Sequence, residues 1–579
     1  MKRCPQCNRV ETDNALVFCR VDGAALVSDS GCSEVGTAKF GGPPIASEVE
    51  TSVLPQHSTQ ADVGRATGPT TVLDRQQTIA GRRDLSTSRR STIVALAIAA
   101  VFIAGIGVVA YVYLARKNNV AIQSIAVLPF TNASGNSDIE YLSDGITESL
   151  INSLSQLPNL SVKARSTVFH YKGKDVSPQQ VGSELSVQAV LNGRVVQRGD
   201  QLTLSLELVD ARTGNQIWGE QYNRKTSDLA ALQSEIARDV SNKLRTKLSG
   251  VEEQRVTKSY TANSEAYQLY LKGRFYWNKR TIDDFNRAIP YFQQAIDKDP
   301  NYALAYSGLA DSYALLSVFE GPPKDWMPRA KAAAMKALAL DNNLAEAHTS
   351  LAQIIAYYDW DFNAAEREFG RAIELNPNYA TAHQWHAENL SSLQRHDEAL
   401  SEMRRAVELD PLALITNRVY GDLLLNARRY DEAIEQYRKT IEMDPNFPTT
   451  HAFLGRAYEA RQMYDQAVTE YLKFPGPGGF SPEGLTKMKE AYAKAGWNGF
   501  VQARLSELLA RSKKDYVAEF ILATWYARLG RKEEAFAWLE KAYQARDYRL
   551  IQLNVRNDLD SLRSDPRFTE LVRKVGLPQ

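Results

Sequence analysis

All four cysteines of this 579-residue chain lie within its first 32 residues. Cys4 and Cys7 form a CxxC pair, Cys19 follows in FCRVDG, and Asp22 stands where a four-cysteine site would place its last ligand. A CxxC pair lets two thiolates reach one ion from a tight turn, and structural zinc takes four such ligands in a tetrahedron. The spacing therefore predicts one structural Zn²⁺ held by Cys4, Cys7, Cys19 and Asp22.

The same stretch, CPQC followed by FCRVDG, resembles the small zinc-ribbon heads of many bacterial membrane proteins, and it departs from their four-cysteine form at Asp22. Cys32 is an alternative fourth ligand, although the intervening VSDSG has the composition of a flexible segment. The other alternative is a ribbon that keeps its turns and has lost its ion. A catalytic zinc is not expected, because no neighbouring side chain would serve as a general base.

Residues 92–114, TIVALAIAAVFIAGIGVVAYVYL, contain no charged side chain. At ~1.5 Å per residue they span about 35 Å as a helix, which is enough to cross a bilayer. A buried core helix is the alternative, but core helices of this length are rarely apolar on every face. The stretch therefore predicts one transmembrane helix. Its small residues leave a homodimer through the membrane open, although many spans contain such residues without dimerising.

Charges beside this span predict its orientation. Four arginines precede the span (Arg82, Arg83, Arg89 and Arg90), whereas Arg116 and Lys117 follow it. The positive-inside rule places the N-terminus in the cytoplasm of a bacterial inner-membrane protein and the region after the span in the periplasm. The cysteines then lie in a reducing compartment, where thiols bind metal rather than pair. Between the head and the span, residues 28–91 are rich in Ser, Thr, Gly and Pro and predict a disordered tether.

The pattern after the span predicts a small sheet covered by helices, over about residues 120–250. SIAVLPF and LSVKARSTVF are expected strands, separated by a helix over DIEYLSDGITESLINSLSQLP. Three further strands follow, broken at RGDQ and ARTGNQ as hairpin turns would break them, and an amphipathic helix closes the segment. The expected order is βαβαβββα, an α/β domain.

Five motifs of this segment, SIAVLPF, YLSDGI, FHYKGK, VLNGRV and LVDARTGNQIWGEQY, resemble the TolB N-terminal-like domain. In bacteria that domain often precedes tetratricopeptide repeats, in proteins headed by adenylate-cyclase, winged-helix or kinase modules. The resemblance implies a domain that is not itself an enzyme. Gly145, Gly193 and Trp218 fall on its recurrent positions and are expected to serve turns and packing. Asp144, before Gly145, is expected to cap a helix or form a turn.

One sequence pattern occurs five times downstream, and its copies run from IDKDPNYALAY to IEMDPNFPTTH. Pro377, Pro411 and Pro445 are 34 residues apart, which is the tetratricopeptide period. An alanine lies twelve residues before each proline, where a small side chain lets two helices approach closely. The pattern predicts an all-α tetratricopeptide superhelix of about eight helix pairs over residues 262–550, with a C-terminal cap over 551–579.

Such a superhelix binds a peptide or a helix of another protein on its concave face. By the repeat register, the candidate partner-binding residues are Gln384, Glu388, Arg418, Asp422, Arg456 and Glu459; a solvated charged surface is the alternative. His383 and His386 have a spacing that can bind metal, but both occupy packing positions of the repeat. The chain contains no HExxH, nucleotide loop, kinase signature or Ser/His/Asp constellation.

Together these features predict a multidomain protein: a zinc-ribbon head over 1–27, a tether, one transmembrane helix, a TolB-N-like α/β domain and a tetratricopeptide superhelix. Lys and Arg (69) balance Asp and Glu (68), so no overall basic field favours nucleic acid. The expected function is a single-pass membrane adaptor or scaffold that binds protein partners and is not an enzyme. The first alternative is a regulatory protein of the cyclase or kinase architecture that relays a periplasmic signal to the cytoplasmic head. The second is an undetected enzyme.

Overall fold

A computed structural model describes residues 2–3, 10–11, 27–28, 122–244, 249–319, 321–474 and 482–579. The chain divides into two compact units, 1–98 and 99–579. The predicted zinc ligands Cys4, Cys7, Cys19 and Asp22 and the predicted transmembrane helix 92–114 lie outside the described residues, as does nearly all of the tether. Among the residues that are described, no helix is long and apolar enough to cross a membrane.

Three two-residue strands are described in the N-terminal unit, and they pair antiparallel in the order β2-β1-β3. They are β1 (Lys2–Arg3), β2 (Val10–Glu11) and β3 (Val27–Ser28). Arg3 lies opposite both Val10 and Val27. Along the chain, the CxxC pair therefore falls between two strands that pair with each other.

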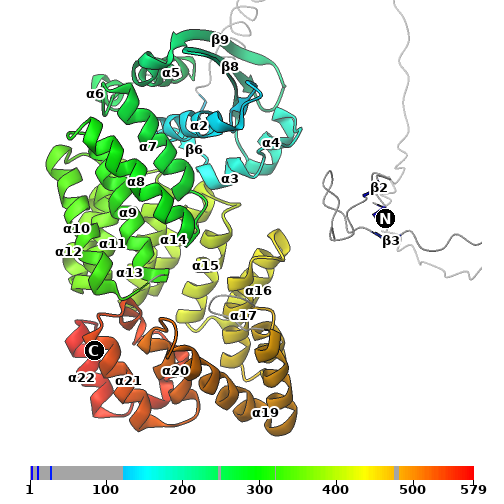
Figure 1. The fold of residues 1–579 in the computed structure, drawn as a ribbon, viewed down its shortest axis with the longest axis vertical. Helices are drawn as coiled ribbons and strands as arrows, with labels where there is room; N and C mark the ends of the chain where they lie inside the picture. Colours follow the sequence, from blue (N-terminus) through cyan, green and yellow to red (C-terminus); the bar gives the residue numbers. More distant parts are fainter. Residues whose placement is uncertain are drawn as a thin grey trace, which may run out of the picture. The chain divides into compact units, whose positions relative to one another are not determined.

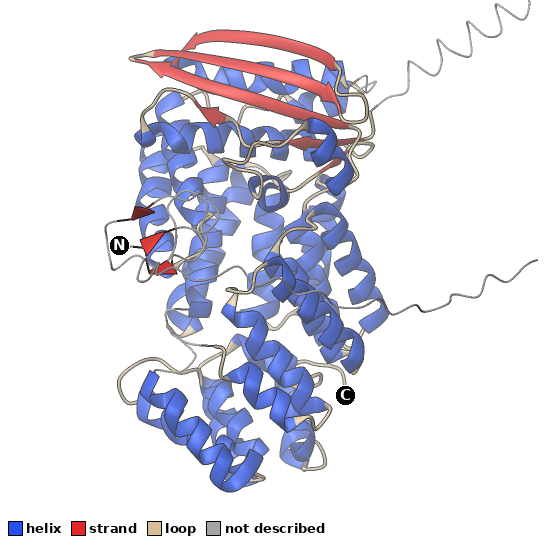
Figure 2. Ribbon diagram, turned by 90° about the vertical axis from the view of Figure 1, so that its right-hand side faces the viewer, coloured by secondary structure: helices blue, strands red, loops and turns tan. Residues whose placement is uncertain are grey.

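The second unit begins with a six-stranded mixed sheet of order β6-β4-β7-β8-β9, with β5 beside β7. The SIAV segment of β4 is buried and pairs parallel with β6 and β7, while β7, β8 and β9 form an antiparallel meander. Gly199, in the turn between β7 and β8, has φ +62°, a conformation that side chains disfavour. Three long strands lie over helices on one side (Figure 2). A small α/β sheet domain is thus present where the sequence predicts one.

The elements of this sheet domain follow the order strand, helix, strand, helices, three strands and helix. Their bounds are β4 (Ser124–Val127), β5 (Thr131–Asn132), η1 (Ser137–Ile139), α2 (Glu140–Ser155), β6 (Ser161–Val162), α3 (Arg165–Phe169), α4 (Pro178–Leu185), β7 (Ala189–Arg198), β8 (Gln201–Asp210), β9 (Gln216–Lys225), η2 (Thr226–Asp228) and α5 (Leu229–Lys243). The short helix α6 (Gly250–Val256) leads into the repeats.

The prediction that LSVKARSTVF (160–169) forms one strand is wrong after its third residue. The strand β6 ends at Val162, and helix α3 begins at Arg165. The amide of Ala164 donates to the carbonyl of Leu409, 2.9 Å away in the repeat array, and the hydroxyl of Thr167 donates to Asp410. These tertiary contacts hold the segment as a helical turn although Thr, Val and Phe favour strands.

Asp144 is neither a helix cap nor part of a turn. It lies inside α2, is 4% exposed, and its carboxylate is 2.6 Å from the Lys172 ammonium. Gly145 follows it within the helix, and a Cβ there would lie 2.8 Å from a side-chain carbon of Leu271. Gly145 therefore serves packing, because it lets α2 approach the first repeat helix, α7 (Ser264–Trp277).

The repeat array is all-α, and its helices pair as A and B helices of successive repeats (Figure 1). In chain order, the pairs within the described residues are α7 with α8 (Ile282–Lys298), α9 (Ala303–Phe319) with α10 (Pro323–Leu340), α11 (Ala345–Ile354) with α12 (Phe362–Leu375), α13 (Ala380–Ser392) with α14 (His396–Leu409), α15 (Leu414–Asn426) with α16 (Tyr430–Met443), α17 (Pro448–Ala460) with α18 (Tyr464–Tyr471), and α20 (Glu519–Arg528) with α21 (Lys532–Gln544). A π-helical turn, η3 (Ile355–Asp359), extends α11, and α19 (Pro482–Arg511) is bent at Ala495 and Gly496.

Small residues set the distance between paired helices, as the repeat pattern predicts. A Cβ on Gly421 of α15 would lie 2.4 Å from the ring of Tyr437 on α16, and one on Gly455 would lie 3.0 Å from Tyr471. Tyr437 and Ala433 are fully buried. Each glycine therefore leaves the space that an aromatic side chain of the B helix fills.

The C-terminal segment folds back against the middle of the array. It comprises η4 (Tyr548–Gln552), η5 (Asn557–Leu562) and α22 (Pro566–Val575) after α21. Tyr548 of η4 stacks on Tyr357 with ring centres 5.3 Å apart, and just before the segment Tyr543 of α21 stacks on Trp360 at 5.4 Å. Residues nearly 200 positions apart thus pack together, and the end of the array closes on its third repeat.

Two turns of the repeat array hold the sheet domain. In the turn after α12, the side-chain amide of Asn378 lies 2.9 to 3.1 Å from the carbonyl oxygens of Ser155, Leu157 and Leu160. After α14, Asp410 accepts hydrogen bonds from the α3 hydroxyls. A third contact joins α2 to α7, where Glu148 accepts from Arg274 at 2.8 Å. The sheet domain and the repeats therefore form one body rather than two loosely linked domains.

Candidate functional site: the inner face of the repeat array

The candidate site is the inner face of the array, which we define as the A-helix positions four, seven, eleven and fourteen residues after each turn position (Pro300, Asn342, Pro377, Pro411 and Pro445). The six predicted partner-binding residues occupy this register on three successive helices. Gln384 and Glu388 lie on α13, Arg418 and Asp422 on α15, and Arg456 and Glu459 on α17. Their role in partner binding stays a prediction; their contacts follow.

The α13 pair forms a hydrogen-bonded link between neighbouring A helices. Glu388 accepts from the amide of Gln384 and from the hydroxyl of Tyr357, each at 3.0 Å. The hydroxyl of Thr416 on α15 donates to Gln384 at 3.1 Å. Burial raises the pKa of the Glu388 carboxyl, although Gln384 and Arg418 oppose the shift. The polar groups of Gln384 and Glu388 therefore already have hydrogen-bond partners within the chain.

The α15 pair is also internally paired. Arg418 forms an ion pair with Asp422 one turn along the helix, and its guanidinium lies 4.5 Å from the ring centre of Phe453. The hydroxyl of Tyr437 donates to Asp422 at 2.6 Å. Burial raises the pKa of Asp422 even though Arg418 lowers it. Tyr437 and Asp422 thus tie the B helix to the inner face.

The two α17 residues differ sharply in their surroundings. Glu459 accepts from Arg528 of α20 at 2.7 and 3.1 Å and from the hydroxyl of Tyr471 at 2.7 Å. Arg456, in contrast, has two buried guanidinium nitrogens, Nε and Nη2, without a hydrogen-bond partner among the described residues. Its guanidinium lies 5.4 Å from the ring centre of Phe453, and burial lowers its pKa. Arg456 is therefore a cation on this face that lacks an acceptor.

A buried ion network connects this region to the C-terminal segment. Arg528 bridges Glu459 and Asp558, with 2.9 Å to the second carboxylate, and Arg556 pairs with Asp558 as well. Burial alone would raise the pKa of Asp558, but Arg556 and Arg528 hold it well below its usual range. The C-terminal segment is thus fixed to the inner face by charge pairs as well as by stacked rings.

The register was applied in the sequence only to the last three of these A helices, and residues on the earlier ones were missed. Leu304, Ser307 and Asp311 of α9, with Glu346 of α11, occupy the same positions four, seven and eleven residues after their turns. They line two adjoining cavities where α2 of the sheet domain covers the array. The offsets of seven and eleven residues that identified Gln384 and Glu388 also select Ser307 and Asp311, whereas Leu304 and Glu346 lie four residues after their turns, an offset that selects none of the six predicted residues.

His383 and His386 both make packing contacts, as the repeat register predicts. Nδ1 of His383 lies 2.6 Å from Glu402 of the B helix, and its Nε2 lies 3.1 Å from the Pro377 carbonyl. The ring of His386 packs against Phe369 at 5.5 Å. The first histidine thus ties an inter-repeat turn to its own repeat, and within the described ranges no cluster of three or more potential ligands would hold a metal ion.

Comparison with known families supports the repeats directly. Residues 279–321, 351–413 and 420–482 match the family model described as a tetratricopeptide repeat. Residues 121–239 match a different family, the second domain of HilA/YgeH-like transcriptional regulators. The resemblance of this segment to the TolB N-terminal-like domain stays a prediction.

One curated relative is "Putative adenylate cyclase 3" from Rhizobium meliloti (strain 1021), 34% identical over 242 residues. The alignment covers 40% of each chain, so this chain spans less than half of that relative's length. Similar solved structures include YrrB, described as a tetratricopeptide protein with an unusual peptide-binding site (24% identity, 31% of this chain, 89% of that chain, TM-score 0.24), and Pseudomonas aeruginosa PilF (20%, 38%, 94%, 0.29). The chain thus carries tetratricopeptide repeats behind a small sheet domain, a fold suited to protein–protein interaction.

Proposed function

We propose that this protein is a membrane-anchored scaffold that binds a protein or peptide partner on the inner face of its repeat array. The observation that carries the proposal is the guanidinium of Arg456, whose buried Nε and Nη2 lack acceptors although the other five predicted partner-binding residues are paired within the chain. A buried donor without an acceptor costs free energy, and a carboxylate or carbonyl of a partner would remove that cost. The proposal assigns binding to the chain and no chemical step.

The direct experiment is affinity capture of the full-length chain from its host after cross-linking in cells. Arg456→Gln removes the cation and breaks no ion pair, while Arg461→Gln, at the exposed end of the same helix, is the matched control. A specific partner should be retained by wild type and by Arg461→Gln and lost with Arg456→Gln.

The anchor and the orientation are the second part of the proposal. The uncharged stretch 92–114 and the arginines before it support one membrane span with the N-terminus in the cytoplasm. Phosphatase and fluorescent-protein fusions after residue 248 test this arrangement. Phosphatase activity without fluorescence is expected for a periplasmic C-terminal region, and fluorescence without phosphatase activity would overturn it.

The cytoplasmic head is proposed to bind one zinc ion through Cys4, Cys7 and Cys19, with Asp22 completing the tetrahedron. The donor set supports this, since three thiolates and one carboxylate oxygen are workable zinc ligands. Pairing of β1 with β2 also supports it, because that pairing brackets the CxxC pair along the chain.

A regulatory role is the second candidate, and the comparisons favour it. The matched relative is named as an adenylate cyclase, and the sheet domain matches a domain of transcriptional regulators. We propose under this alternative that the sheet domain and repeats sense a partner outside the membrane and the head responds inside, as a TolB-N–repeat architecture would imply. Cross-linking must then identify partners on both sides of the membrane. Partners on one side alone would contradict the regulatory role and favour the scaffold role.

A further inference from the structure

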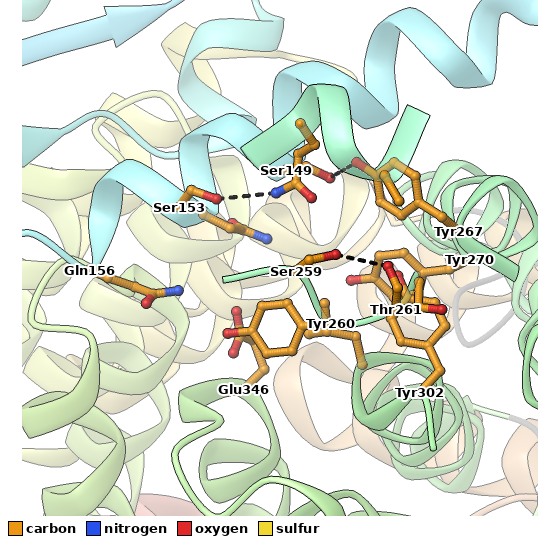
Figure 3. Close-up of a pocket in the computed structure, with 14 residues that line it drawn as sticks. Ser149, Ser153, Gln156, Ser259, Tyr260, Thr261, Tyr267, Tyr270, Tyr302 and Glu346 are labelled. Atoms are coloured by element: carbon orange, nitrogen blue, oxygen red, sulfur yellow. Dashed lines mark hydrogen bonds between the residues drawn. The ribbon is translucent and has the colours of Figure 1, made fainter. Parts of the chain in front are cut away.

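Two small cavities adjoin where α2 of the sheet domain packs over the A helices α7, α9 and α11. Figure 3 shows residues that line the first of them. Each has a volume of about 30 Å³, which holds one or two water-sized groups. Asn152, Tyr270, Leu304 and Glu346 line both. The first is bordered by exposed Ser259, so it reaches solvent on that side.

Glu346 supplies the carboxylate shared by the two cavities. It lies in the first turn of α11, beside the ring of Tyr260 (Figure 3). In the described structure no other residue gives its carboxylate a hydrogen bond or an ion pair. Burial raises its pKa, and Arg274 opposes that shift only in part. The carboxylate thus lies at a partly enclosed site without a counter-ion of its own.

Arg274, the cation that acts on Glu346, already forms ion pairs with other carboxylates. Arg274 donates to Glu148 at 2.8 Å, with its second nitrogen 2.6 Å from the same carboxylate, and lies 3.7 Å from Asp311. Arg165 lies 3.1 Å from Glu148, and Arg280 acts on Asp311, so each of these two carboxylates has a further cation beside it. Glu346 shares its one cation, Arg274, with both of them.

Hydroxyl groups without partners surround the same space. Ser307 is 2% exposed, lines the second cavity, and its Oγ has no hydrogen-bond partner in the described structure. The hydroxyls of Tyr270 and Tyr302, whose ring centres are 5.3 Å apart, also donate to no other described residue. Buried polar groups are normally paired, so the Ser307 hydroxyl requires water or a ligand. The two tyrosine hydroxyls are available to a ligand in the first cavity.

We propose that the two adjoining cavities bind the ammonium group of a primary amine, with Glu346 as its counter-ion and the hydroxyls that line them as acceptors: Tyr270 in both, Tyr302 in the first and Ser307 in the second. An ammonium group carries one positive charge and three donors, and it matches a site with one free carboxylate and several acceptors. Its size matches cavities of about 30 Å³. Tyrosine rings beside it add cation–π attraction. A phosphate or carboxylate ligand is disfavoured by repulsion from the Glu346 carboxylate, which lines both cavities.

This inference goes beyond the scaffold role, because the cavities are built from α2, α7, α9 and α11 and do not include Arg456. The ammonium group has two sources, a free small amine or a lysine side chain of a peptide. Calorimetric titration of the full-length protein with n-butylammonium chloride tests the first, and titration with N-acetyl-lysine amide tests the second. The neutral controls are 1-butanol and the Nζ-acetylated lysine derivative.

We expect saturable binding of at least one amine and no binding of the neutral controls. Glu346→Gln should weaken it about tenfold or more, since a charged hydrogen bond is lost. Glu265→Gln is the matched control, because Glu265 lies in the first turn of α7 and is exposed outside the cavities. Ser307→Ala serves as the second variant if Glu346→Gln does not fold, and it should weaken binding severalfold. Equal binding of amine and neutral control, no saturable heat with either amine, or unchanged affinity in the folded variant would each overturn the proposal.

Discussion

The hydroxyl of Thr167 donates to the carboxylate of Asp410 at 2.7 Å, although 243 residues separate them along the chain. Thr167 belongs to helix α3 of the sheet domain, and Asp410 caps the turn after the repeat helix α14. The Leu412 amide donates in turn to the Thr167 hydroxyl at 3.0 Å. In the sequence these turns only mark the ends of repeats. In the structure, the turns between repeats form the surface on which the sheet domain packs.

Removing the side-chain amide of Asn378 should lower the stability of the unit formed by the sheet domain and the repeat array. Asn378→Ala leaves carbonyls of the segment after α2 without donors, so we expect about 2–3 kcal/mol less free energy of unfolding. Asn446→Ala is a matched control, because Asn446 also follows the turn proline directly but is exposed. It should change stability by less than about 0.5 kcal/mol. Urea unfolding followed by circular dichroism measures both; equal losses would contradict the docking role of Asn378.

Replacement by alanine should change the free energy of unfolding in opposite directions at two helical glycines. At Gly421 a Cβ would lie 2.4 Å from the ring of Tyr437, and we expect a loss of about 1–3 kcal/mol from overpacking. At Gly370, inside α12, nothing lies within 4 Å of an added Cβ, and alanine should gain about 0.5–1 kcal/mol through helix propensity. Thermal melting of both variants tests the pair, and stabilisation by Gly421→Ala would show that the helices are not packed as described.

Asp558 should contribute stability that depends on pH. Arg556 and Arg528 hold its folded pKa below the unfolded value, so the contribution is present above about pH 4 and is lost as the pH falls toward the folded pKa. Asp558→Asn should therefore cost roughly 3–5 kcal/mol at pH 7, because it leaves buried arginines unpaired, and less below about pH 4. Asp560→Asn, at an exposed ion pair, should cost less than about 1 kcal/mol. A pH-independent difference for Asp558→Asn would refute the assignment.

Metal content of the full-length protein tests the proposed head. Wild type should carry one zinc ion per chain, Cys19→Ser should lose it, and Cys32→Ser should keep it. Asp22→Cys should hold the metal more tightly, since thiolate sulfur is the softer ligand. Absence of zinc from wild type together with its gain in Asp22→Cys would identify a ribbon that keeps its turns and has lost its ion.

The repeats could be predicted because their signal is periodic and redundant. Pro377, Pro411 and Pro445 mark the same turn in consecutive copies, and the small residues facing Tyr437 and Tyr471 recur at fixed offsets. Alternation and turn signals likewise predicted the meander β7 to β9. Helix α3 was missed because its conformation depends on hydrogen bonds to residues about 240 positions away, which no local pattern encodes.

Less of the candidate site could be predicted, for a related reason. The register correctly placed Arg418 and Asp422 on one face of one helix, but it carries no information on what packs against that face. The salt bridge from Glu459 to Arg528 and the stacking of Tyr357 on Tyr548 arise only when the array closes on itself. Glu346 lies at an offset of four residues, outside the offsets of the six predicted residues, and its enclosure by α2 has no signal in the repeat pattern.

The central claim is that the inner face captures a partner at Arg456, and quantitative affinity capture tests it most directly. Full-length wild type, Arg456→Gln and Arg461→Gln are cross-linked in cells, purified in parallel and compared by mass spectrometry. We predict at least one protein retained equally by wild type and Arg461→Gln and reduced about tenfold or more with Arg456→Gln, the loss expected for a charged hydrogen bond. The same proteins at the same levels in all three samples would contradict the claim.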